Sequence, residues 1–293
     1  MDTMAPGRPV VVGVDGSEEA DAALRWAADE ARRRRRSLRV VYAADLGSAT
    51  LAAGLYPELT VAARRAAQDM LDVAVARAHE RAADVHVDTA MQDGRASAVL
   101  LGQTPHAELL VLGSAGRGGF AGMLLGSTAL QVAMHAQCPV VVLRSGAEGS
   151  PTGSSVGRVV VGVDGSRQSA AAVSLAFQEA DLRGIGVTAV RTWLGPELDV
   201  EAPPTHEWEQ AEKNEQARLA EDLHIWRSRF PNVDLVEKTV RGGPAPTLIA
   251  ESAGAALLAV GSHGRDGFGG LVLGSVSHAV LHHAHCPVAV ARP

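Results

Sequence analysis

The sequence predicts an α/β protein built from two tandem domains, each with a mostly parallel β-sheet covered by helices on both faces. Two observations lead to this prediction. Short β-branched runs alternate with helical patterns along the 293 residues, which is typical of parallel sheets with helical crossovers. The string VVVGVDGS at residues 10–17 also returns unchanged at residues 159–166, and GSAGRGGFAGMLLGS at 113–127 returns as GSHGRDGFGGLVLGS at 261–275.

The repeated strings indicate a tandem duplication and set the expected domain boundaries. Overlaying residues 113–142 on residues 261–290 gives 17 identities in 30 positions, so a loop, a helix and a strand recur in register. We expect domains at residues 1–146 and 156–293. The residues between them, 147–155, are rich in glycine and serine and contain one proline, which is the composition of a flexible linker.

In the first half, residues 10–14 form the expected first strand. We expect Ser17 to cap the helix that follows. This start places Glu18 and Glu19 in the first turn, where the helix dipole favours acidic side chains. The remaining expected elements are, in chain order, a strand at 38–43, a long helix at 58–83, a strand at 84–90, a short helix at 96–103, a strand at 108–113, a helix at 127–136 and a strand at 139–143. The second half repeats this order, with its long helix at residues 207–230.

Composition and charge narrow the class of function. Apolar residues make up 46% of the chain, charged residues 20% and aromatic residues 3%, so we expect a core of valine, leucine and alanine. The formal net charge of −6 argues against broad binding to nucleic acid or membranes, which requires a basic surface.

Apolar runs fall short of the ~18 residues of a membrane span, and the N-terminus lacks the apolar segment of a signal peptide, so we expect a cytoplasmic protein. The two cysteines, Cys138 and Cys286, are too few for a disulfide framework and are expected to be buried.

The glycine-rich segment after the fourth strand predicts a phosphate site. It leads from the carboxyl end of a strand to the N-terminus of a helix, where unpaired N–H groups attract anions, and glycine lets the backbone approach a phosphate closely. A long flexible turn is the alternative, but the same glycine spacing in both halves favours a phosphate cradle. Neither loop contains the lysine of a P-loop nucleotide hydrolase. GRGGFA at 116–121 fits a dinucleotide fingerprint, whereas its counterpart GRDGFG at 264–269 does not.

The spacing Gly-x2-Gly-x9-Gly-Ser resembles the ATP-binding signature of the universal stress protein family. The opening VGVDGS also resembles that family, and the likeness covers nearly the whole chain, twice. The resemblance implies two Rossmann-like domains of the adenine nucleotide alpha hydrolase-like type, each a five-stranded sheet of order 3-2-1-4-5. It further implies up to one ATP for each domain. Mg²⁺ is the companion ion expected with ATP.

Carried over position by position, the resemblance assigns candidate nucleotide-binding residues in both halves. Asp15 and Asp164, with Gly13 and Gly162, would contact the adenosine moiety. Val41 and Val190, at the ends of the second strands, would meet the adenine edge through their backbone. Ribose and phosphates would be held by the glycine loops and the start of the next helix, namely Gly113, Ser114, Gly116, Arg117, Gly126, Ser127 and Thr128 in the first half and Gly261, Ser262, Gly264, Arg265, Gly274, Ser275 and Val276 in the second.

The residue types fit these roles, although each has a structural alternative. An aspartate just past a strand end can accept from a ribose hydroxyl or an adenine amine, or it can serve as a turn or cap residue. Ser127 and Ser275 can cap their helices and also donate to phosphate. Arg117 and Arg265 can add charge-assisted hydrogen bonds or face solvent. Asp266 replaces Gly118 of the first copy and places a like charge near the expected phosphates, unless a divalent ion bridges them.

Two clusters of charged or titratable residues are assigned no ligand. Residues 32–36 are five arginines, expected at a solvated helix C-terminus, where the dipole favours cations. His278 and His282 lie four residues apart, a spacing that can hold a metal. However, among the histidines of this segment only His283 has a counterpart in the first half, His135, and a helix C-terminus is an ordinary place for histidine. We therefore expect no metal site.

The expected function is nucleotide-dependent regulatory binding rather than catalysis. Neither half repeats a lysine, histidine or glutamate placed as a base beside the glycine loop, and phosphoryl transfer needs an oriented nucleophile. A slow ATPase or an adenylate-transferring enzyme is the alternative, and a nucleotide-free scaffold is a third hypothesis. The expected partner is an adenine nucleotide, without nucleic acid or membrane. The resemblance also implies an intramolecular pseudo-dimer of the two domains and, across chains, a homodimer.

Overall fold

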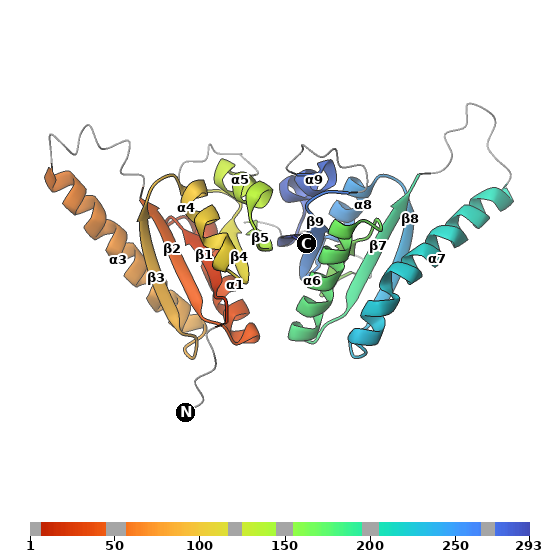
Figure 1. Ribbon diagram of the computed structural model, residues 1–293, viewed down its shortest axis with the longest axis horizontal. Coiled ribbons are helices and arrows are strands. Elements are labelled where there is room, and N and C mark those ends of the chain that lie inside the picture. The colour runs from red at the N-terminus through yellow and green to blue at the C-terminus, as the bar shows by residue number, and fades with distance from the viewer. Residues whose placement is uncertain (1–6, 45–56, 117–124, 145–154, 195–204, 265–272) are drawn as a thin grey trace. The chain divides into compact units, whose positions relative to one another are not determined.

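The computed structural model of the chain describes residues 7–44, 57–116, 125–144, 155–194, 205–264 and 273–293. The chain divides into two compact units, Met1–Ser145 and Gly146–Pro293. Each unit is a parallel sheet with helices on both faces (Figure 1), as the alternating sequence pattern predicts. We call these units domain 1 and domain 2.

The elements of domain 1 follow the predicted order of strands and helices. In chain order they are β1 (Val10–Val14), α1 (Glu18–Arg34), β2 (Leu38–Ala44), α3 (Pro57–Arg81), β3 (Val87–Asp93), α4 (Ala96–Gln103), the short 3₁₀ helix η1 (Thr104–His106), β4 (Leu109–Gly113), α5 (Ser127–His135) and β5 (Val140–Leu143). The strands are parallel and lie in the order β3-β2-β1-β4-β5. Val10 of β1 is in register with Leu38 of β2 and Leu109 of β4.

Domain 2 repeats this arrangement. Its elements are β6 (Val159–Gly162), α6 (Arg167–Arg183), β7 (Val187–Trp193), α7 (Thr205–Arg229), β8 (Leu235–Arg241), α8 (Pro244–Glu251), β9 (Leu257–Gly261), α9 (Ser275–His283) and β10 (Val288–Ala291). The strand order is β8-β7-β6-β9-β10, with parallel pairing throughout. Both domains therefore have the expected order 3-2-1-4-5, which places the first and fourth strands side by side.

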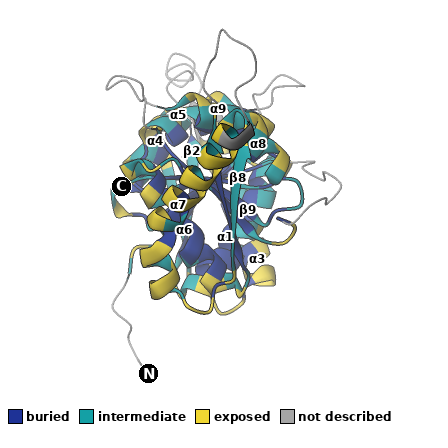
Figure 2. Ribbon diagram, turned by 90° about the vertical axis from the view of Figure 1, so that its right-hand side faces the viewer, coloured by how far each residue is buried: buried dark blue, intermediate teal, exposed yellow. Residues whose placement is uncertain are grey.

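The sheets form the middle layer of each domain. β1 and β5 are buried at every residue, because valine and leucine pack against helices on both faces. In domain 1, α1 and α3 pack together on one face of the sheet, and α4 and α5 pack together on the other. The long helices keep an exposed outer side, which Figure 2 shows along α7. Among the described residues, none of the helices combines the length and apolar character needed to cross a bilayer.

The third strand begins later than the sequence pattern predicts. The alternation at residues 84–90 suggested a strand from Asp84, but β3 starts at Val87. Val85 is buried within a turn, where its N–H donates to the carbonyl of Ala82 (3.2 Å). A valine buried in a turn and a valine in the strand therefore give the same alternating signal.

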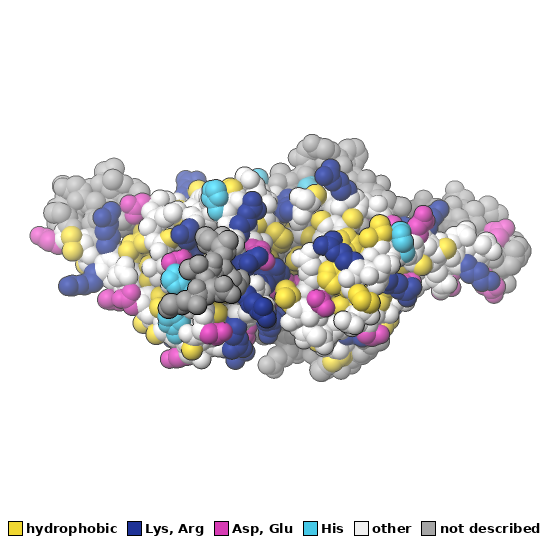
Figure 3. All heavy atoms as spheres, turned by 60° about the horizontal axis from the view of Figure 1, so that its bottom comes forward, with side chains coloured by type: hydrophobic (Ala, Val, Ile, Leu, Met, Phe, Trp, Pro, Cys, Tyr) yellow, Lys and Arg dark blue, Asp and Glu magenta, His cyan; other side chains and the backbone are white. Residues whose placement is uncertain are grey.

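The arginine run at the end of α1 is not simply solvated. The side chain of Arg34 is only 7% exposed and contacts Glu30 (2.6 Å) and Glu108 (2.9 Å). Arg36 also contacts Glu108 (2.5 Å). These ion pairs tie the end of α1 to the residue before β4, so part of the run has a packing role that helix position alone did not reveal. Elsewhere, acidic and basic side chains are intermixed on the face drawn in Figure 3.

Candidate functional site

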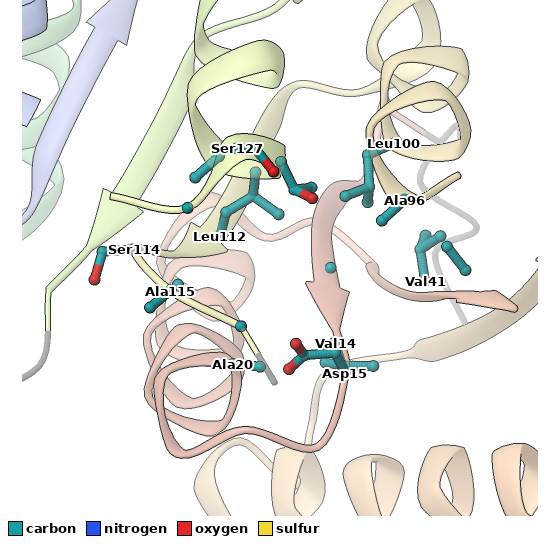
Figure 4. Close-up of a pocket in the computed structure, with 17 residues that line it drawn as sticks. Val14, Asp15, Ala20, Val41, Ala96, Leu100, Leu112, Ser114, Ala115 and Ser127 are labelled. Atoms are coloured by element: carbon teal, nitrogen blue, oxygen red, sulfur yellow. The ribbon is translucent and has the colours of Figure 1, made fainter. Parts of the chain in front are cut away.

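A cavity of about 350 Å³ lies at the carboxyl ends of the central strands of domain 1 (Figure 4). Asp15, from the end of β1, and Ser127, from the start of α5, lie on opposite sides of it. Val41, Ala96 and Leu100 form an apolar wall. Apart from Arg117, which lies outside the described residues, all the candidate residues of domain 1 line this cavity: Gly13, Asp15, Val41, Gly113, Ser114, Gly116, Gly126, Ser127 and Thr128.

Sequence reasoning missed the small and apolar residues that complete the cavity wall. These are Val14, Ala20, Ala43, Ala96, Leu100, Leu112, Ala115 and Ala129. The period of two in a strand could have identified Ala43, because it shares a face of β2 with Val41. Alanines on α1, α4 and α5 carry no chemical signal of their own, and only the helix packing brings them to the cavity.

Asp15 is held in place by the turn that follows β1. One carboxylate oxygen, Oδ1, accepts from the backbone N–H of Ser17 (3.0 Å) and from its hydroxyl (2.6 Å). The other oxygen, Oδ2, lies 2.5 Å from the position that a Cβ on Gly116 would occupy. The aspartate is thus both a turn residue and a wall of the cavity, and glycine at position 116 leaves room for its carboxylate.

Domain 2 repeats this geometry. Asp164 Oδ1 accepts from the N–H of Ser166 (2.9 Å), and Asp164 Oδ2 lies 2.9 Å from the Cβ position of Gly264. The same aspartate–glycine contact in both copies indicates that the start of each glycine loop, up to Gly116 or Gly264, lies against the turn after the first strand of its domain.

Several of the glycines that recur in both halves allow close packing around the cavity. A Cβ on Gly113 would lie 2.7 Å from the backbone carbonyl carbon of Glu19 in α1, and a Cβ on Gly261 would lie 2.8 Å from the backbone of Gln168 in α6. At Gly13, a Cβ would lie 2.7 Å from Leu112. Gly113 and Gly261 let the first helix of each domain approach the sheet closely, and Gly13 leaves room for the Leu112 side chain of β4.

The two ends of each glycine loop are joined by a backbone hydrogen bond. The N–H of Gly126 donates to the carbonyl of Ser114 (2.6 Å), and the N–H of Gly274 donates to that of Ser262 (2.7 Å). These two amides are therefore already used within the protein. The N-cap residues are Gly126 and Gly274, not the serines that follow, because α5 and α9 begin at Ser127 and Ser275.

This placement changes which groups can meet an anion. Ser127 and Thr128 lie in the first turn of α5, where backbone N–H groups have no acceptor within the helix. A glycine cap has no side chain to accept from these groups, so the start of α5 keeps its donors for another partner. In contrast, Ser17 Oγ accepts from the N–H of Ala20 at the start of α1 (3.1 Å).

The charges of the site also distinguish the two helix starts. The first turn of α1 carries Glu18, Glu19 and Asp21, whereas the first turn of α5 carries no acidic residue. Asp15 is the one charged side chain among the described residues that line the cavity. A bound anion is therefore favoured at the start of α5, and disfavoured near α1 and Asp15.

Val41 and Val190 lie in the middle of β2 and β7, and the expectation that they end these strands was wrong. Gly13 is in register with Val41, and Gly162 with Val190. The carbonyl of Val190 accepts from the N–H of Val163 (2.9 Å), so this backbone group takes part in the ladder. The side chain of Val41 lines the cavity, and Ala43 is the next residue on that face of β2 toward the strand end.

The candidate residues of domain 2 occupy the equivalent places. The paired strands β6, β7 and β9, the residues directly after β6 and β9, and the start of α9 with its N-cap carry these candidates, which are Gly162, Asp164, Val190, Gly261, Ser262, Gly264, Gly274, Ser275 and Val276. Arg265 and Asp266 lie outside the described residues. His263 stands where Ala115 lines the cavity of domain 1, and its Nδ1 lies 3.2 Å from the Ser262 hydroxyl.

The cysteines do not contribute a reactive group to the site. Cys138 and Cys286 are both buried, and neither is in a disulfide. Burial raises the pKa of the Cys286 thiol to about 12. Because the thiolate is the nucleophilic form, this thiol is unreactive at neutral pH.

Comparisons with known proteins match both halves of the chain. The model of the universal stress protein family matches residues 7–144 and 155–292. A universal stress protein of Mycobacterium tuberculosis is 39% identical over 287 residues, which cover 97% of this chain and 96% of the relative. A universal stress protein of Mycolicibacterium smegmatis is 35% identical over 288 residues, 97% of each chain. The crystal structure of a universal stress protein from Archaeoglobus fulgidus has the same fold, with a TM-score of 0.69, 18% identity and 98% of both chains covered. The chain therefore belongs to the universal stress protein family and carries two copies of the family's domain in tandem.

Proposed function

We propose that the protein is a nucleotide-dependent regulatory module. Each domain would bind one adenine nucleotide, and ATP is the expected ligand. The observation that carries this proposal is the cavity of domain 1. It combines an apolar wall, an aspartate held by the turn after β1, and the start of α5, which has no side-chain cap, within about 350 Å³. In parallel α/β sheets, ligands bind beyond the carboxyl ends of the strands, and this cavity lies there.

The parts of the cavity suit the three parts of the nucleotide. Val41, Ala96 and Leu100 offer an apolar surface for the adenine ring. Asp15 lies between that wall and the glycine loop, where its carboxylate can accept from the ribose hydroxyls. The backbone N–H groups of Ser127 and Thr128 can donate to the phosphates at a helix N-terminus that lacks acidic residues.

The residues present also fit Mg²⁺ as a companion of the phosphates. The described lining holds no lysine or arginine, so part of the polyphosphate charge needs another counterion. Mg²⁺ is bound by few protein oxygens together with substrate phosphates, and the hydroxyls of Ser127 and Thr128 are oxygen donors of this kind. Mg²⁺ would supply charge neutralisation at the phosphates.

The cavity is better suited to holding ATP than to hydrolysing it. General-base catalysis needs a titratable group that can take a proton from the attacking water. Among the described lining residues only Asp15 is of this type, and its Oδ1 already accepts two hydrogen bonds from Ser17. We therefore expect turnover well below about 1 s⁻¹, the lower end of ordinary enzymes.

The proposal is tested by calorimetric titration of the full chain with Mg·ATP, using Asp15→Asn and Asp164→Asn. Asparagine keeps an oxygen that accepts from the serine of the turn but replaces the second acceptor with a donor. Each variant should lose one of two equivalents of ATP, or bind it about 10–100 times more weakly, as expected for a lost charge-assisted hydrogen bond.

Asp88→Asn is the matched control, because Asp88 lies near the amino end of β3, away from the cavity, and its side chain is 47% exposed. This variant should bind ATP as the unmodified chain does. Two unchanged equivalents in both Asp15→Asn and Asp164→Asn would contradict the assigned site, and no binding to the unmodified chain would contradict the function.

A further inference from the structure

Two histidine rings face each other on α9. His278 and His282 are four residues apart on the helix, and their ring centroids are separated by 4.5 Å. His278 is exposed and His282 is half-buried, so the pair lies at the surface of domain 2. The sequence shows the spacing of the pair, but only the structure shows that the two rings turn toward one another.

This arrangement has the dimensions of a shared metal ion. Two imidazoles at positions i and i+4 of a helix are a recurrent zinc-binding pair. An ion about 2.0–2.1 Å from one nitrogen of each ring needs those nitrogens about 3.3 Å apart in tetrahedral geometry. The two ring centroids are already 4.5 Å apart. Because Nε2 of His282 is buried, rotation of this side chain is part of forming the site.

The ordinary reasons for histidine in a helix do not explain the pair. The negative end of the helix dipole accounts for His282 and His283 in the last turn of α9, but His278 lies one turn earlier. Packing does not require imidazoles either. The equivalent positions of α5 in domain 1 are Leu130 and Met134, which are half-buried apolar residues on a helix of the same length.

We propose that His278 and His282 form a surface site for a divalent transition-metal ion of the class that imidazole prefers, namely Zn²⁺, Ni²⁺ or Cu²⁺. Within the described part of the chain, no group of three or more histidine, cysteine, aspartate or glutamate residues is arranged to hold a metal. The site therefore has two protein ligands, and water completes the coordination. It is specific to domain 2 and separate from the Mg²⁺ proposed at the phosphates, because Mg²⁺ prefers oxygen ligands.

The bridge would also stabilise the end of α9. An ion held by residues in consecutive turns fixes the helical backbone between them, from His278 to His282. This region is the far end of the helix whose first turn carries Ser275 and Val276. The inference itself uses only the two rings and does not depend on nucleotide binding.

The site is tested by titrating the full chain with ZnCl₂ and with NiCl₂ in the absence of nucleotide, followed by calorimetry. We expect one metal equivalent in excess of any weak background, and no displacement by a large excess of MgCl₂. His278→Ala and His282→Gln should each weaken binding at least about tenfold, because loss of a direct ligand costs no less than loss of an outer-shell partner.

His283→Ala is the matched control. His283 lies on the same helix and is exposed, but its ring centroid is 6.0 Å from that of His282, so its removal should leave the affinity unchanged. Because His278 is exposed, His278→Ala tests the site even if His282→Gln disturbs folding. Absence of metal binding by the unmodified chain, or equal affinity in His278→Ala, would overturn the proposal.

Discussion

Arg35 and Gly184 occupy equivalent positions directly after the first helix of each domain, and both have a left-handed backbone. Their φ angles are 54° and 65°, and each donates its N–H to a carbonyl of the last helical turn. Arg35 is the one non-glycine residue with positive φ among the residues that the structure describes. It is exposed, and a Cβ on Gly184 would meet no atom within 4 Å. The cost at this position is therefore conformational and not steric.

The magnitude follows from two opposing effects. A non-glycine residue in the left-handed region costs about 1–2 kcal/mol. Glycine recovers this energy but loses about 0.5–1 kcal/mol more through backbone entropy on folding. We expect Arg35→Gly to raise the free energy of unfolding of domain 1 by about 0.5–1 kcal/mol, and Gly184→Ala to lower that of domain 2 by a similar amount.

Urea denaturation of the full chain, followed by far-UV circular dichroism, measures both changes, and hydrogen exchange of the α1 and α6 amides assigns each change to its domain. An unchanged m-value would show that only stability has altered. The reasoning would be refuted if Arg35→Gly left the midpoint unchanged or lowered it, or if Gly184→Ala were neutral.

Three further predictions concern packing, acid stability and the thiols. Gly113→Ala should lower the free energy of unfolding by about 1–3 kcal/mol, because its Cβ would lie 2.7 Å from the backbone of α1, whereas Gly102→Ala, with open space around it, should be neutral or stabilising in the same urea titration. Burial raises the pKa of Glu251, but hydrogen bonds from Lys238 and Ser155 outweigh it and hold this pKa below its ordinary value. The resulting stabilisation is present above about pH 4.3 and lost as the pH falls below it. Thermal unfolding in Lys238→Met should therefore depend less on pH in this range, and an unchanged pH profile would argue against the pair. Cys286, with its pKa raised to about 12, should react with iodoacetamide at pH 8 only after denaturation, and rapid labelling of the native chain would contradict its burial.

The repeated pattern predicted the strand–helix alternation and the two domains, and the resemblance to the universal stress protein family supplied the strand order. The repeated VVVGVDGS and glycine-rich strings fixed the strand–helix alternation and its register between the two halves. The predicted start of β3 was wrong, because the buried Val85 of the preceding turn continues the alternating pattern of the strand. A period of two shows that alternate residues are buried, but it does not show which backbone groups enter the ladder.

The sequence predicted which residues belong to the candidate site, but not why the structure requires them at those positions. The glycine spacing identified residues that the structure brings to one cavity. It could not show that Gly113 is needed for the approach of α1, because that contact depends on how the helix crosses the sheet. It also could not show that the Gly126 N–H already donates to the carbonyl of Ser114.

The histidines illustrate a different limit of sequence reasoning. Comparison of the two halves argued against a metal at His278 and His282, because domain 1 lacks the pair. The distance between their rings depends on side-chain rotamers, which no repeat comparison contains. A feature found in one copy of a duplication can thus be specific to that copy, and this is the interpretation that the metal titration examines.

The most direct test of the central claim is the number of adenine nucleotides that one chain holds. The protein is saturated with Mg·ATP, freed of excess ligand by rapid gel filtration, denatured, and the released nucleotide is identified and quantified by chromatography. If the uncapped start of the helix after each glycine loop binds phosphate, two adenine nucleotides should be released per chain. Release of none, together with no retention of labelled ATP in equilibrium dialysis, would contradict the account.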